Sequence, residues 1–376
     1  MNPKIAAFLR THMPATPCLV LDLDRVETNY RRIMAAMPLA RVYYAVKANP
    51  AAPILQRLVG LGSSFDAASF EEVEACLAAG ADPALISYGN TVKKESAIKA
   101  AFEQGVTMFA FDSEPELKKI ARAAPGARVY CRIFVGNDGA EWPLSKKFGC
   151  EIDMAKRLMA MAEDLGLDAY GISFHVGSQQ TTTGAYEAAI AKVAMLFTDL
   201  REAGVNLRMV NLGGGYPVRY RQEVPEIDDF GAAIMGAMAE HFGNALPEMV
   251  IEPGRFIVGD AGVVEAEVVL VSRKGDNDPV RWVYLDIGRF GGLAETEGEA
   301  IRYAFRTPHD GGADGPVTIA GPTCDSVDTL YEKSNYRLPL ALADGDRVQL
   351  MATGAYVTTY ASQSFNGFRP LAEHYI

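Results

Sequence analysis

The sequence of 376 residues contains few cysteines and no long apolar segment. The five cysteines, at positions 18, 76, 131, 150 and 324, are odd in number and widely separated. This spacing fits neither a disulfide framework nor a zinc site, so we expect a cytoplasmic protein without a metal. Lys, Arg, His and Pro interrupt the N-terminal stretch, and no run of about 18 apolar residues follows it. Neither a signal peptide nor a membrane span is therefore expected.

The chain also lacks an excess of basic residues. Lys and Arg number 36 against 47 Asp and Glu, which gives a net charge of −11. Such a charge repels phosphate backbones and anionic membranes, so neither nucleic acid nor a membrane is an expected partner. Hydrophobic residues at 49% and charged residues at 22% are the balance of a globular protein. This composition excludes disordered, collagen-like and coiled-coil chains.

Short apolar runs alternate with longer helical segments from about residue 42 to residue 255. The runs with strand character are 42–48, 63–67, 85–88, 107–111, 128–135, 170–176, 209–212 and 249–252. The segments between them, such as 69–80 and 183–204, are long enough to be crossover helices. Eight strands that are each followed by a helix predict a closed (β/α)8 barrel of the TIM type.

A different pattern follows residue 255. Turns separate β-branched stretches at 263–272, 281–286, 316–320 and 347–351, and the segment 16–23 also has strand character. We therefore predict an α/β protein with a barrel domain over residues 24–258 and a C-terminal, mainly β domain over residues 259–376. The N-terminal strand within residues 1–23 is expected to join the β domain.

Chemically informative residues stand at the carboxyl ends of the predicted barrel strands. They are Lys47, Asp66, Asn90, Asp112, Arg132, His175, the glycines 213–215, Glu252 and Arg255. Reactive side chains of such barrels belong at that end, because only there do the loops converge on one opening. The pattern therefore predicts an active site at this opening.

Lys47 is a single charged residue at the end of the apolar segment YYAVKAN. A lone lysine in that position commonly reaches water along its flexible stem. Burial among apolar neighbours would instead favour the neutral amine, which is the nucleophile that captures an aldehyde. Both interpretations of Lys47 stay open on this evidence.

The segments NLGGGYP and EPGR together predict a phosphate site. Gly213, Gly214 and Gly215 can bring backbone N–H groups close to an anion, although tight turns use the same residues. The loops after strands 7 and 8 are the usual phosphate site of this fold. The second of these loops carries Gly254 and Arg255, whose guanidinium can bind phosphate oxygens.

Glu252 directly precedes this phosphate site. Alone it could be a structural carboxylate paired with an arginine. Beside an aldehyde-binding lysine and a phosphate site, it suits pyridoxal phosphate, whose ring nitrogen stays protonated when an anion faces it. His175, in FHVGSQ, has no second histidine at metal-ligand spacing. Its alternatives are stacking on a flat cofactor ring and burial in the core.

The motifs YYAVKANP, FDAAS, FHVGSQ, NLGGGYP, EPGR, GPTCDSVD and GAY with FNGF span residues 43–368 in this order. On these motifs the sequence resembles the fold-type III pyridoxal-phosphate decarboxylases, the alanine-racemase-like barrel group, and within it ornithine decarboxylase and its bacterial lysine/ornithine relatives. The resemblance implies a (β/α)8 barrel, a β domain and pyridoxal phosphate as the cofactor.

The resemblance also implies a role for each matching residue. Lys47 would bind the cofactor covalently, His175 would stack on its ring and Glu252 would face the ring nitrogen. The other cofactor-binding residues would be Asp66, Arg132, Ser178, Gly213, Gly214, Gly215, Gly254, Arg255 and Tyr356. Cys324 would protonate the α-carbon of the substrate, and Asp325 would pair with its distal ammonium group.

The substrate end of the site departs from the eukaryotic pattern. The segment FGGLAETEGEA stands where eukaryotic ornithine decarboxylases carry an aspartate, and either Glu295 or Glu299 could bind the distal amine. Phe365, of FNGF, would also line the substrate site. A longer carboxylate would alter the preferred chain length, so the choice between ornithine and lysine stays open.

A head-to-tail homodimer with shared active sites is a further implication of the resemblance. Cys324 and Asp325 would reach into the partner subunit's barrel. Lys147, Asp328 and Gly354 match residues at the contact between subunits. The segment 136–145 would form a mobile lid.

The implied activity is pyridoxal-phosphate-dependent decarboxylation of a basic L-amino acid. L-Ornithine, which gives putrescine and CO2 in polyamine biosynthesis, is the first expected substrate. The alternatives are dual specificity for lysine and ornithine, or decarboxylation of arginine, diaminopimelate or carboxynorspermidine. An alternative of a different class is a non-catalytic relative that binds pyridoxal phosphate. Such a relative would be expected to lose Lys47 or the pair Cys324 and Asp325, which this chain keeps.

Overall fold

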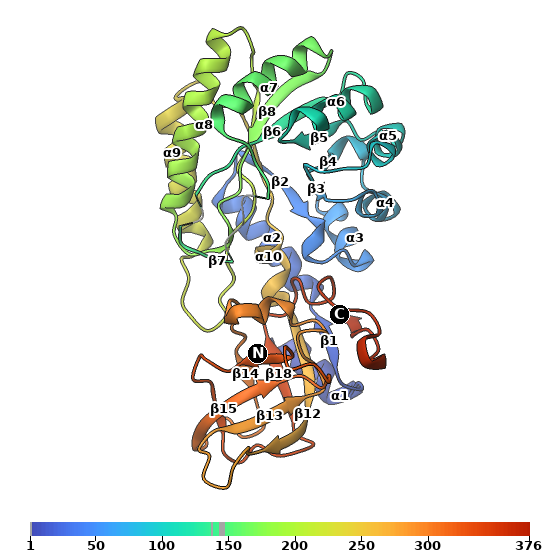
Figure 1. Cartoon of the computed structure of the whole chain (residues 1–376), viewed down its shortest axis with the longest axis vertical. Coiled ribbons are helices and arrows are strands. Elements are labelled where there is room, and N and C mark those ends of the chain that lie inside the picture. Colours follow the sequence, from blue (N-terminus) through green and yellow to red (C-terminus); the bar gives the residue numbers. More distant parts are fainter. Residues whose placement is uncertain (1, 137, 143–146) are drawn as a thin grey trace. The chain divides into compact units, whose positions relative to one another are not determined.

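The computed structural model describes residues 2–136, 138–142 and 147–376. The chain folds into two compact units (Figure 1). The barrel unit comprises Glu27–Pro217 and Val224–Gly254. The β unit comprises Met1–Val26, Val218–Glu223 and Arg255–Ile376. The EPGR segment therefore contributes to both units, with Gly254 in the barrel unit and Arg255 in the β unit.

Parallel strands form a closed barrel, as predicted. In order around the barrel they are β10 (Met209–Asn211), β11 (Glu248–Ile251), β2 (Ala40–Ala45), β3 (Ser64–Ala67), β4 (Ile86–Tyr88), β5 (Met108–Phe111), β6 (Arg128–Arg132) and β8 (Asp168–Ser173). Each of the eight expected runs overlaps one of these strands. The pairing register sets Asp66 of β3 opposite Ala45 of β2 on one side and Ser87 of β4 on the other.

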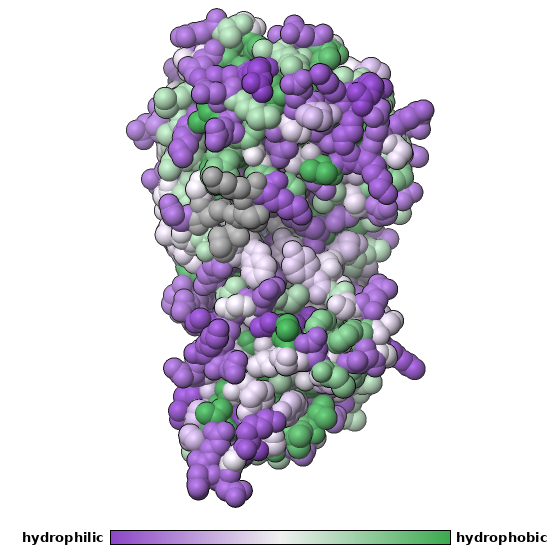
Figure 2. All heavy atoms as spheres, viewed as in Figure 1, coloured by the Kyte–Doolittle hydropathy of each residue, from purple (hydrophilic) through white to green (hydrophobic). Residues whose placement is uncertain are grey.

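Helices connect the barrel strands and surround them (Figure 1). They are α2 (Leu23–Ala36), α3 (Ala52–Gly60), α4 (Phe70–Ala78), α5 (Glu95–Glu103), α6 (Glu114–Ala123), α7 (Ile152–Asp164), α8 (Gly184–Glu202) and α9 (Ile227–Phe242), with a short 3₁₀ turn η2 (Pro83–Leu85) before β4. On the face drawn in Figure 2, hydrophilic side chains are spread over these helices with isolated hydrophobic ones between them. The apolar faces of the helices are turned to the strands, as expected for amphipathic crossover helices.

Local sequence explains where helix α4 begins. The Oγ of Ser69 accepts a hydrogen bond from the amide of Glu72 at 3.2 Å, and the Glu72 carboxylate accepts one from the amide of Ala68 at 2.7 Å. These bonds satisfy amides that a helix start leaves without partners. They fix the turn that directly follows strand β3, and with it the end of the strand that carries Asp66.

Aromatic and apolar side chains fill the barrel interior. The cluster consists of Tyr43, Met108, Ala110, Tyr130, Tyr170, Met209 and Val250, all of them buried. Burying each large side chain of this kind contributes roughly 1.5–3 kcal/mol to folding. The interior is therefore a packed core. The charged side chains of the predicted site lie at the carboxyl end of the barrel, outside this core.

The β unit is built on one mixed sheet. Its main order is β14 (Phe305–Arg306), β18 (Arg347–Met351), β12 (Gly262–Ser272), β13 (Arg281–Leu285), β15 (Asp314–Ala320) and β16 (Thr329–Tyr331), with β17 (Arg337–Pro339) beside β15. Strand β1 (Cys18–Leu21) pairs antiparallel with β12 and parallel with β19 (Ala372–Tyr375). The N-terminal strand thus belongs to the same sheet as the C-terminal one.

Alternating side chains explain the core of the β unit. In β18, Val348 and Leu350 are buried, whereas the residues before and after each of them are partly exposed. This period of two is typical of a strand with one face on a core. The remaining short elements of the unit are α1 (Pro3–His12), α10 (Arg255–Val258), η3 (Gly259–Ala261), η4 (Ala294–Glu299) and η5 (Phe365–Gly367).

One small sheet was not expected from the sequence. Strand β7 (Ala140–Trp142) pairs antiparallel with β9 (Ser178–Gln180), and strands this short carry too few residues for a periodic pattern. Residues 137 and 143–145 of the predicted lid lie outside the described residues. Among the helices that the structure describes, none is both long and apolar enough to cross a membrane.

Candidate active site

Lys47 lies at the opening of the barrel, directly after strand β2. The strand ends at Ala45, and Lys47 is the middle residue of the 3₁₀ turn η1 (Val46–Ala48) rather than the strand residue that we expected. Its Nζ is 3.5 Å from Oδ2 of Asp66. The side chain of Lys47 is 42% exposed and that of Asp66 only 4%. The amine is therefore accessible to a ligand, with a buried carboxylate beside it.

Two carboxylates act on the environment of this amine. Burial raises the pKa of the Asp66 carboxyl well above its usual range, and the nearby Glu252 carboxylate raises it further. The Lys47 ammonium group opposes both effects on that pKa. The structure thus brings Lys47, Asp66 and Glu252 into one electrostatic environment, as the barrel pattern predicted.

Asn211 ends strand β10 and holds two of the predicted site residues. Its Nδ2 donates a hydrogen bond to Oε1 of Glu252 at 2.5 Å, and its Oδ1 accepts one from the amide of Gly213 at 2.9 Å. Asn211 is buried, so these bonds are shielded from water. Our sequence reasoning missed this residue. Its position at a strand end, two residues before the triple glycine, was the signal that could have found it.

The triple glycine allows neighbouring loops to approach closely. Gly213 has a φ of +68°, and a Cβ there would lie 2.2 Å from the carbonyl oxygen of Phe174. A Cβ on Gly214 would lie 2.6 Å from the carbonyl oxygen of Glu252, and one on Gly215 would meet another backbone oxygen at 2.4 Å. Each of the three positions therefore requires glycine, and the loop packs against the residues that follow β8 and β11.

His175 follows strand β8 with a defined ring tautomer. Its Nδ1 accepts a hydrogen bond from the amide of Gly177 at 3.0 Å, so the proton of the neutral ring is on Nε2. Desolvation lowers the pKa of His175 well below its usual value, and the cations of Arg132 and Lys47 lower it further. A neutral, flat ring at the barrel opening fits the predicted stacking on a cofactor.

Arg132 ends strand β6, as predicted. Its guanidinium lies 5.2 Å from the ring centre of Phe148. Burial lowers the pKa of Arg132, and the Glu252 carboxylate is the strongest of the charges that oppose this shift. Ser178 begins strand β9 of the small sheet, opposite Trp142.

Two other polar residues at strand ends hold loops in place. The side-chain amide of Asn90 donates to the carbonyl oxygen of Ala68 at 3.1 Å. Asp112 accepts hydrogen bonds from the Thr91 hydroxyl and from the amide of Gly149, both at 2.8 Å. These bonds give Asn90 and Asp112 a structural function in the barrel unit.

In the β unit, Arg255 and Glu295 form a buried ion pair. The Nη2 of Arg255 is 2.5 Å from Oε1 of Glu295, its Nη1 donates to Oε2 at 2.8 Å, and the two side chains are 3% and 4% exposed. Nη1 also donates to the Tyr220 hydroxyl at 2.7 Å, and the guanidinium lies 4.8 Å from the ring centre of Tyr356. Burial alone would lower the pKa of Arg255, but the Glu295 carboxylate raises it well above its usual range. The sequence did not predict this pairing.

Asp328 fixes the loop that carries GPTCDSVD. Its Oδ1 accepts a hydrogen bond from the amide of Arg289 at 2.7 Å, and its Oδ2 accepts from the amide and the hydroxyl of Thr323 at 3.1 and 2.7 Å. Asp328 is buried, whereas Cys324 and Asp325 are exposed. The loop therefore presents the predicted proton donor and the predicted substrate carboxylate on the surface of the β unit.

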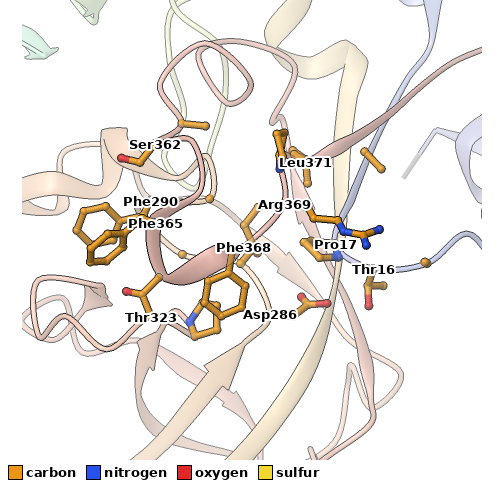
Figure 3. A pocket seen from close by; sticks show the side chains of 18 residues that line it. Thr16, Pro17, Asp286, Phe290, Thr323, Ser362, Phe365, Phe368, Arg369 and Leu371 are labelled. Carbon is orange, nitrogen blue, oxygen red and sulfur yellow. The ribbon is translucent and has the colours of Figure 1, made fainter.

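A pocket of about 330 Å³ lies near this loop in the β unit (Figure 3). The rings of Phe290 and Phe365 are 4.6 Å apart at one side of it, and Phe368 also lines it. The Oδ1 of Asn366 accepts a hydrogen bond from the amide of Cys324 at 2.9 Å. The FNGF segment of the β unit thus packs against the GPTCDSVD loop of the same unit.

Two of the residues predicted at the subunit contact, Gly354 and Lys147, lie close to other residues of their own unit. A Cβ on Gly354 would lie 1.8 Å from the carbonyl oxygen of Val258, so that position has no room for a side chain. The Nζ of Lys147 lies 5.0 Å from the ring centre of Phe148. Their role between subunits stays a prediction.

The barrel opening fits pyridoxal phosphate on its own geometry. The exposed amine of Lys47 suits an aldehyde, and the oriented carboxylate of Glu252 suits a ring nitrogen. The neutral imidazole of His175 suits the face of a ring. The glycine loop packs closely against the backbone that follows β8 and β11, and a loop of successive glycines at this opening suits a phosphate.

Comparison with known proteins agrees with this geometry. The family model described as pyridoxal-dependent decarboxylase, pyridoxal binding domain, matches residues 23–259. A lysine/ornithine decarboxylase from Selenomonas ruminantium is 38% identical over 370 residues, which cover 98% of this chain and 91% of that protein. Antizyme inhibitor 2 from Xenopus laevis is 32% identical over 374 residues, which cover 95% of this chain and 80% of that protein.

A solved structure of a mutant of SrLDC in complex with PLP matches the fold with a TM-score of 0.90 at 35% identity. The match covers 100% of this chain and 95% of that one. Together with the lysine, carboxylate, imidazole and glycine loop at the barrel opening, these similarities establish the family. The chain belongs to the pyridoxal-dependent decarboxylases, and it is a carboxy-lyase with pyridoxal phosphate as its cofactor.

Proposed function

We propose that the protein decarboxylates a basic L-amino acid, with ornithine as the first substrate and lysine as the second. The observation that carries the proposal is the accessible amine of Lys47 at the barrel opening, 3.5 Å from Asp66 and in one electrostatic environment with Glu252. Similarity to a relative named lysine/ornithine decarboxylase supports the substrate class. The reaction would serve polyamine biosynthesis in the cytoplasm.

Each residue of the barrel opening has a separate task in this proposal. Bound pyridoxal phosphate supplies an electron sink for the bonding pair that the departing carboxyl group leaves behind. Lys47 would hold the cofactor through its amine. Glu252 would keep a proton on the ring nitrogen, and the hydrogen bond from Asn211 orients that carboxylate. His175 would pack on the ring, held in plane by the amide of Gly177.

The phosphate group would bind to the glycine loop and to the other residues that match the family's phosphate ligands. The proposed ligands are Ser178, Gly213, Gly214, Gly215, Gly254, Arg255 and Tyr356. Arg255 already donates to Glu295, but a guanidinium carries five N–H donors and can bind a second anion. Asp66 and Arg132 would line the floor of the cofactor site.

The distal ammonium group of the substrate would bind a carboxylate. Glu299 is an unsuitable candidate, because its Oε1 accepts the backbone amides of Glu332 and Lys333 at 2.8 and 2.5 Å. Glu295 is equally committed, because both of its oxygens bind the buried Arg255 guanidinium. We therefore assign this role to the exposed Asp325 and give Glu295 the task of holding Arg255. A desolvated carboxylate selects for a substrate with a basic side chain.

Residues of the exposed loop would complete the site of a second subunit. Cys324 would deliver a proton to the α-carbon, and Asp325 and Phe365 would contact the substrate side chain. The support is that Cys324 and Asp325 are exposed on a loop whose Thr323 donates two hydrogen bonds to the buried Asp328. The protein would then act as a homodimer, with Lys147, Asp328 and Gly354 at the contact.

The similarity to antizyme inhibitor 2 supports a second candidate, a non-catalytic protein that binds a partner. The two candidates differ in the residues that catalysis needs. Lys47, Cys324 and Asp325 are all present in this chain, which favours the enzyme.

Release of CO2 from a panel of amino acids tests the proposal directly. The panel contains ornithine, lysine, arginine and meso-diaminopimelate, each with and without added pyridoxal phosphate. We expect ornithine and lysine to release CO2 with added cofactor, and the Lys47→Ala variant to release none. Release from diaminopimelate alone would overturn the assigned substrate class, and no release from any substrate would favour the non-catalytic candidate.

A further inference from the structure

The carboxylate of Asp66 occupies a recess that exists because residue 89 is glycine. Gly89 directly follows strand β4, and its amide donates to the carbonyl oxygen of Ala67 at 2.9 Å. A Cβ on Gly89 would lie 1.8 Å from Oδ1 and 2.8 Å from Cγ of Asp66. The φ of Gly89 is not in the left-handed region, so the backbone itself would accept any residue. The constraint at this position is therefore purely one of space.

The register of the barrel decides where Asp66 can go if the recess is closed. Strand β3 lies between β2 and β4, and Asp66 is paired with Ala45 on one side and Ser87 on the other. Lys47 stands two residues after Ala45, and Gly89 stands two residues after Ser87. The carboxylate thus has the recess on one side and the amine on the other. A side chain at position 89 would push it toward Lys47.

The present arrangement keeps the ion pair loose. The Nζ of Lys47 is 3.5 Å from Oδ2 of Asp66, whereas a tight charge-assisted hydrogen bond is about 2.7–2.9 Å long. Within the described part of the chain, the buried Oδ1 of Asp66 accepts no hydrogen bond. A buried carboxylate with an unpaired oxygen favours its neutral form, which weakens its hold on a neighbouring ammonium group.

We propose that Gly89 is a positioning residue for Lys47, because its missing side chain gives Asp66 a place to lie away from the amine. This inference rests on the proposed function, in which Lys47 must attack an aldehyde as a neutral amine. A tight ion pair would hold the amine protonated and slow that attack. The three atoms nearest to a Cβ on Gly89 all belong to Asp66, so a side chain at position 89 would act on Lys47 through Asp66.

Other titratable groups face the same pair and must stay unchanged in a test. They are Glu72 and Cys76 on α4, Glu252 after β11, Tyr130 and Arg132 on β6, and the neutral His175 after β8. None of them has an atom among the nearest neighbours of a Cβ on Gly89. A substitution at this position therefore acts first on Asp66.

The test is a spectroscopic titration of the cofactor-loaded protein. We expect Gly89→Ala to raise the pH midpoint of the visible absorption band by about half a unit or more, because a closer carboxylate favours the protonated nitrogen on residue 47. Asp66→Asn removes the charge and keeps the shape, so adding Gly89→Ala to Asp66→Asn should cause no further shift. The matched control is Gly60→Ala, where an added Cβ meets nothing within 4 Å.

Two results would overturn the inference. One is an unchanged midpoint in Gly89→Ala, and the other is an equal shift with and without Asp66. Absence of the visible band in the wild-type protein would instead contradict the proposed function, so the two failures are distinguishable.

A stability measurement covers the case in which Gly89→Ala folds poorly. Asp66→Ser shortens the side chain and leaves room for a Cβ on residue 89. Gly89→Ala should then lower the melting temperature in the presence of Asp66 and leave it nearly unchanged beside Asp66→Ser. Equal loss in both backgrounds would show that the recess does not belong to Asp66, and the inference would be wrong.

Discussion

Asn211 donates a hydrogen bond to the carboxylate of Glu252 across two neighbouring strands of the barrel. The same amide group accepts the backbone amide of Gly213, at the start of the glycine loop. One buried side chain thus links the carboxylate proposed for the ring nitrogen to the loop proposed for the phosphate. Asn211 therefore positions both ends of the proposed cofactor site.

Replacing Asn211 with Ala should weaken both ends of this site. A hydrogen bond to a charged group contributes about 1.5–3 kcal/mol, so we expect a loss of about tenfold to a hundredfold in kcat/KM and weaker cofactor retention. Steady-state kinetics and dialysis against cofactor-free buffer measure the two effects. Asn206→Ala is the matched control, because that side chain is exposed and bonds only weakly, at 3.4 Å, to Gly204. Equal retention in both variants would contradict the role given to Asn211.

Breaking the Arg255 and Glu295 pair from one side should destabilise the protein strongly. Glu295→Ala leaves a buried cation without its partner, which costs about 3–5 kcal/mol in the free energy of unfolding. Replacing both residues with Met should cost less than Glu295→Ala alone, and urea unfolding measures both. Asp314→Ala is the control, because its pair with Arg337 is half exposed and should contribute less than about 1 kcal/mol. A loss for Glu295→Ala no larger than for the control would contradict the buried pairing.

Lys93 should make stability depend on pH in the alkaline range. Burial lowers the pKa of this lysine from 10.5 to about 8, although the Glu116 carboxylate at 3.0 Å opposes the shift. Below pH 8 the lysine is charged in the folded and unfolded chain, so the cost of burying the charge is fully present. As the pH rises from 8 to 10.5, the folded protein loses this proton before the unfolded chain does, and stability increases.

The measurement is the free energy of unfolding of the wild-type protein minus that of Lys93→Met. This difference should rise between pH 8 and pH 10.5, because other titrating groups contribute equally to both proteins. A difference that stays constant over that range would show that the folded and unfolded chains bind the lysine proton equally.

Shared active sites predict complementation between inactive variants. Lys47→Ala and Cys324→Ala each disable a residue that we assign to opposite subunits of one site. An equal mixture of exchanged subunits would restore about a quarter of the activity, because half of the dimers are mixed and each has one intact site. Activity after co-refolding, compared with each variant alone, measures this. Heterodimers that are proven by differential tagging and remain inactive would argue against sharing.

The sequence was sufficient to place the barrel side of the site. Lys47, Asp66, Arg132 and His175 are far apart in the chain, but a closed barrel brings all strand ends to one opening whatever their spacing. Counting strands was therefore enough to predict that these residues meet. Strand counting could not predict that Lys47 lies in a 3₁₀ turn instead of the strand. The apolar run of the sequence continues past the end of the strand, so it gives no signal for where the strand ends.

Side-chain pairings could not be predicted in the same way. Arg255 and Glu295 are separated by 40 residues, and their contact depends on how the segment after β13 folds. Likewise, the recess at Gly89 depends on the rotamer of Asp66 as well as on strand order. Periodicity predicts which face of an element is buried, but it carries no information on which buried polar groups pair with each other.

Covalent attachment of the cofactor at Lys47 is the central claim, and borohydride reduction tests it most directly. The protein is loaded with pyridoxal phosphate, reduced, digested and mapped by mass spectrometry. We predict one phosphopyridoxyl group on the peptide that contains Lys47, with no other lysine of the barrel modified to a comparable extent. A modification at another lysine, or a loaded protein that yields no reduced adduct, would contradict the account.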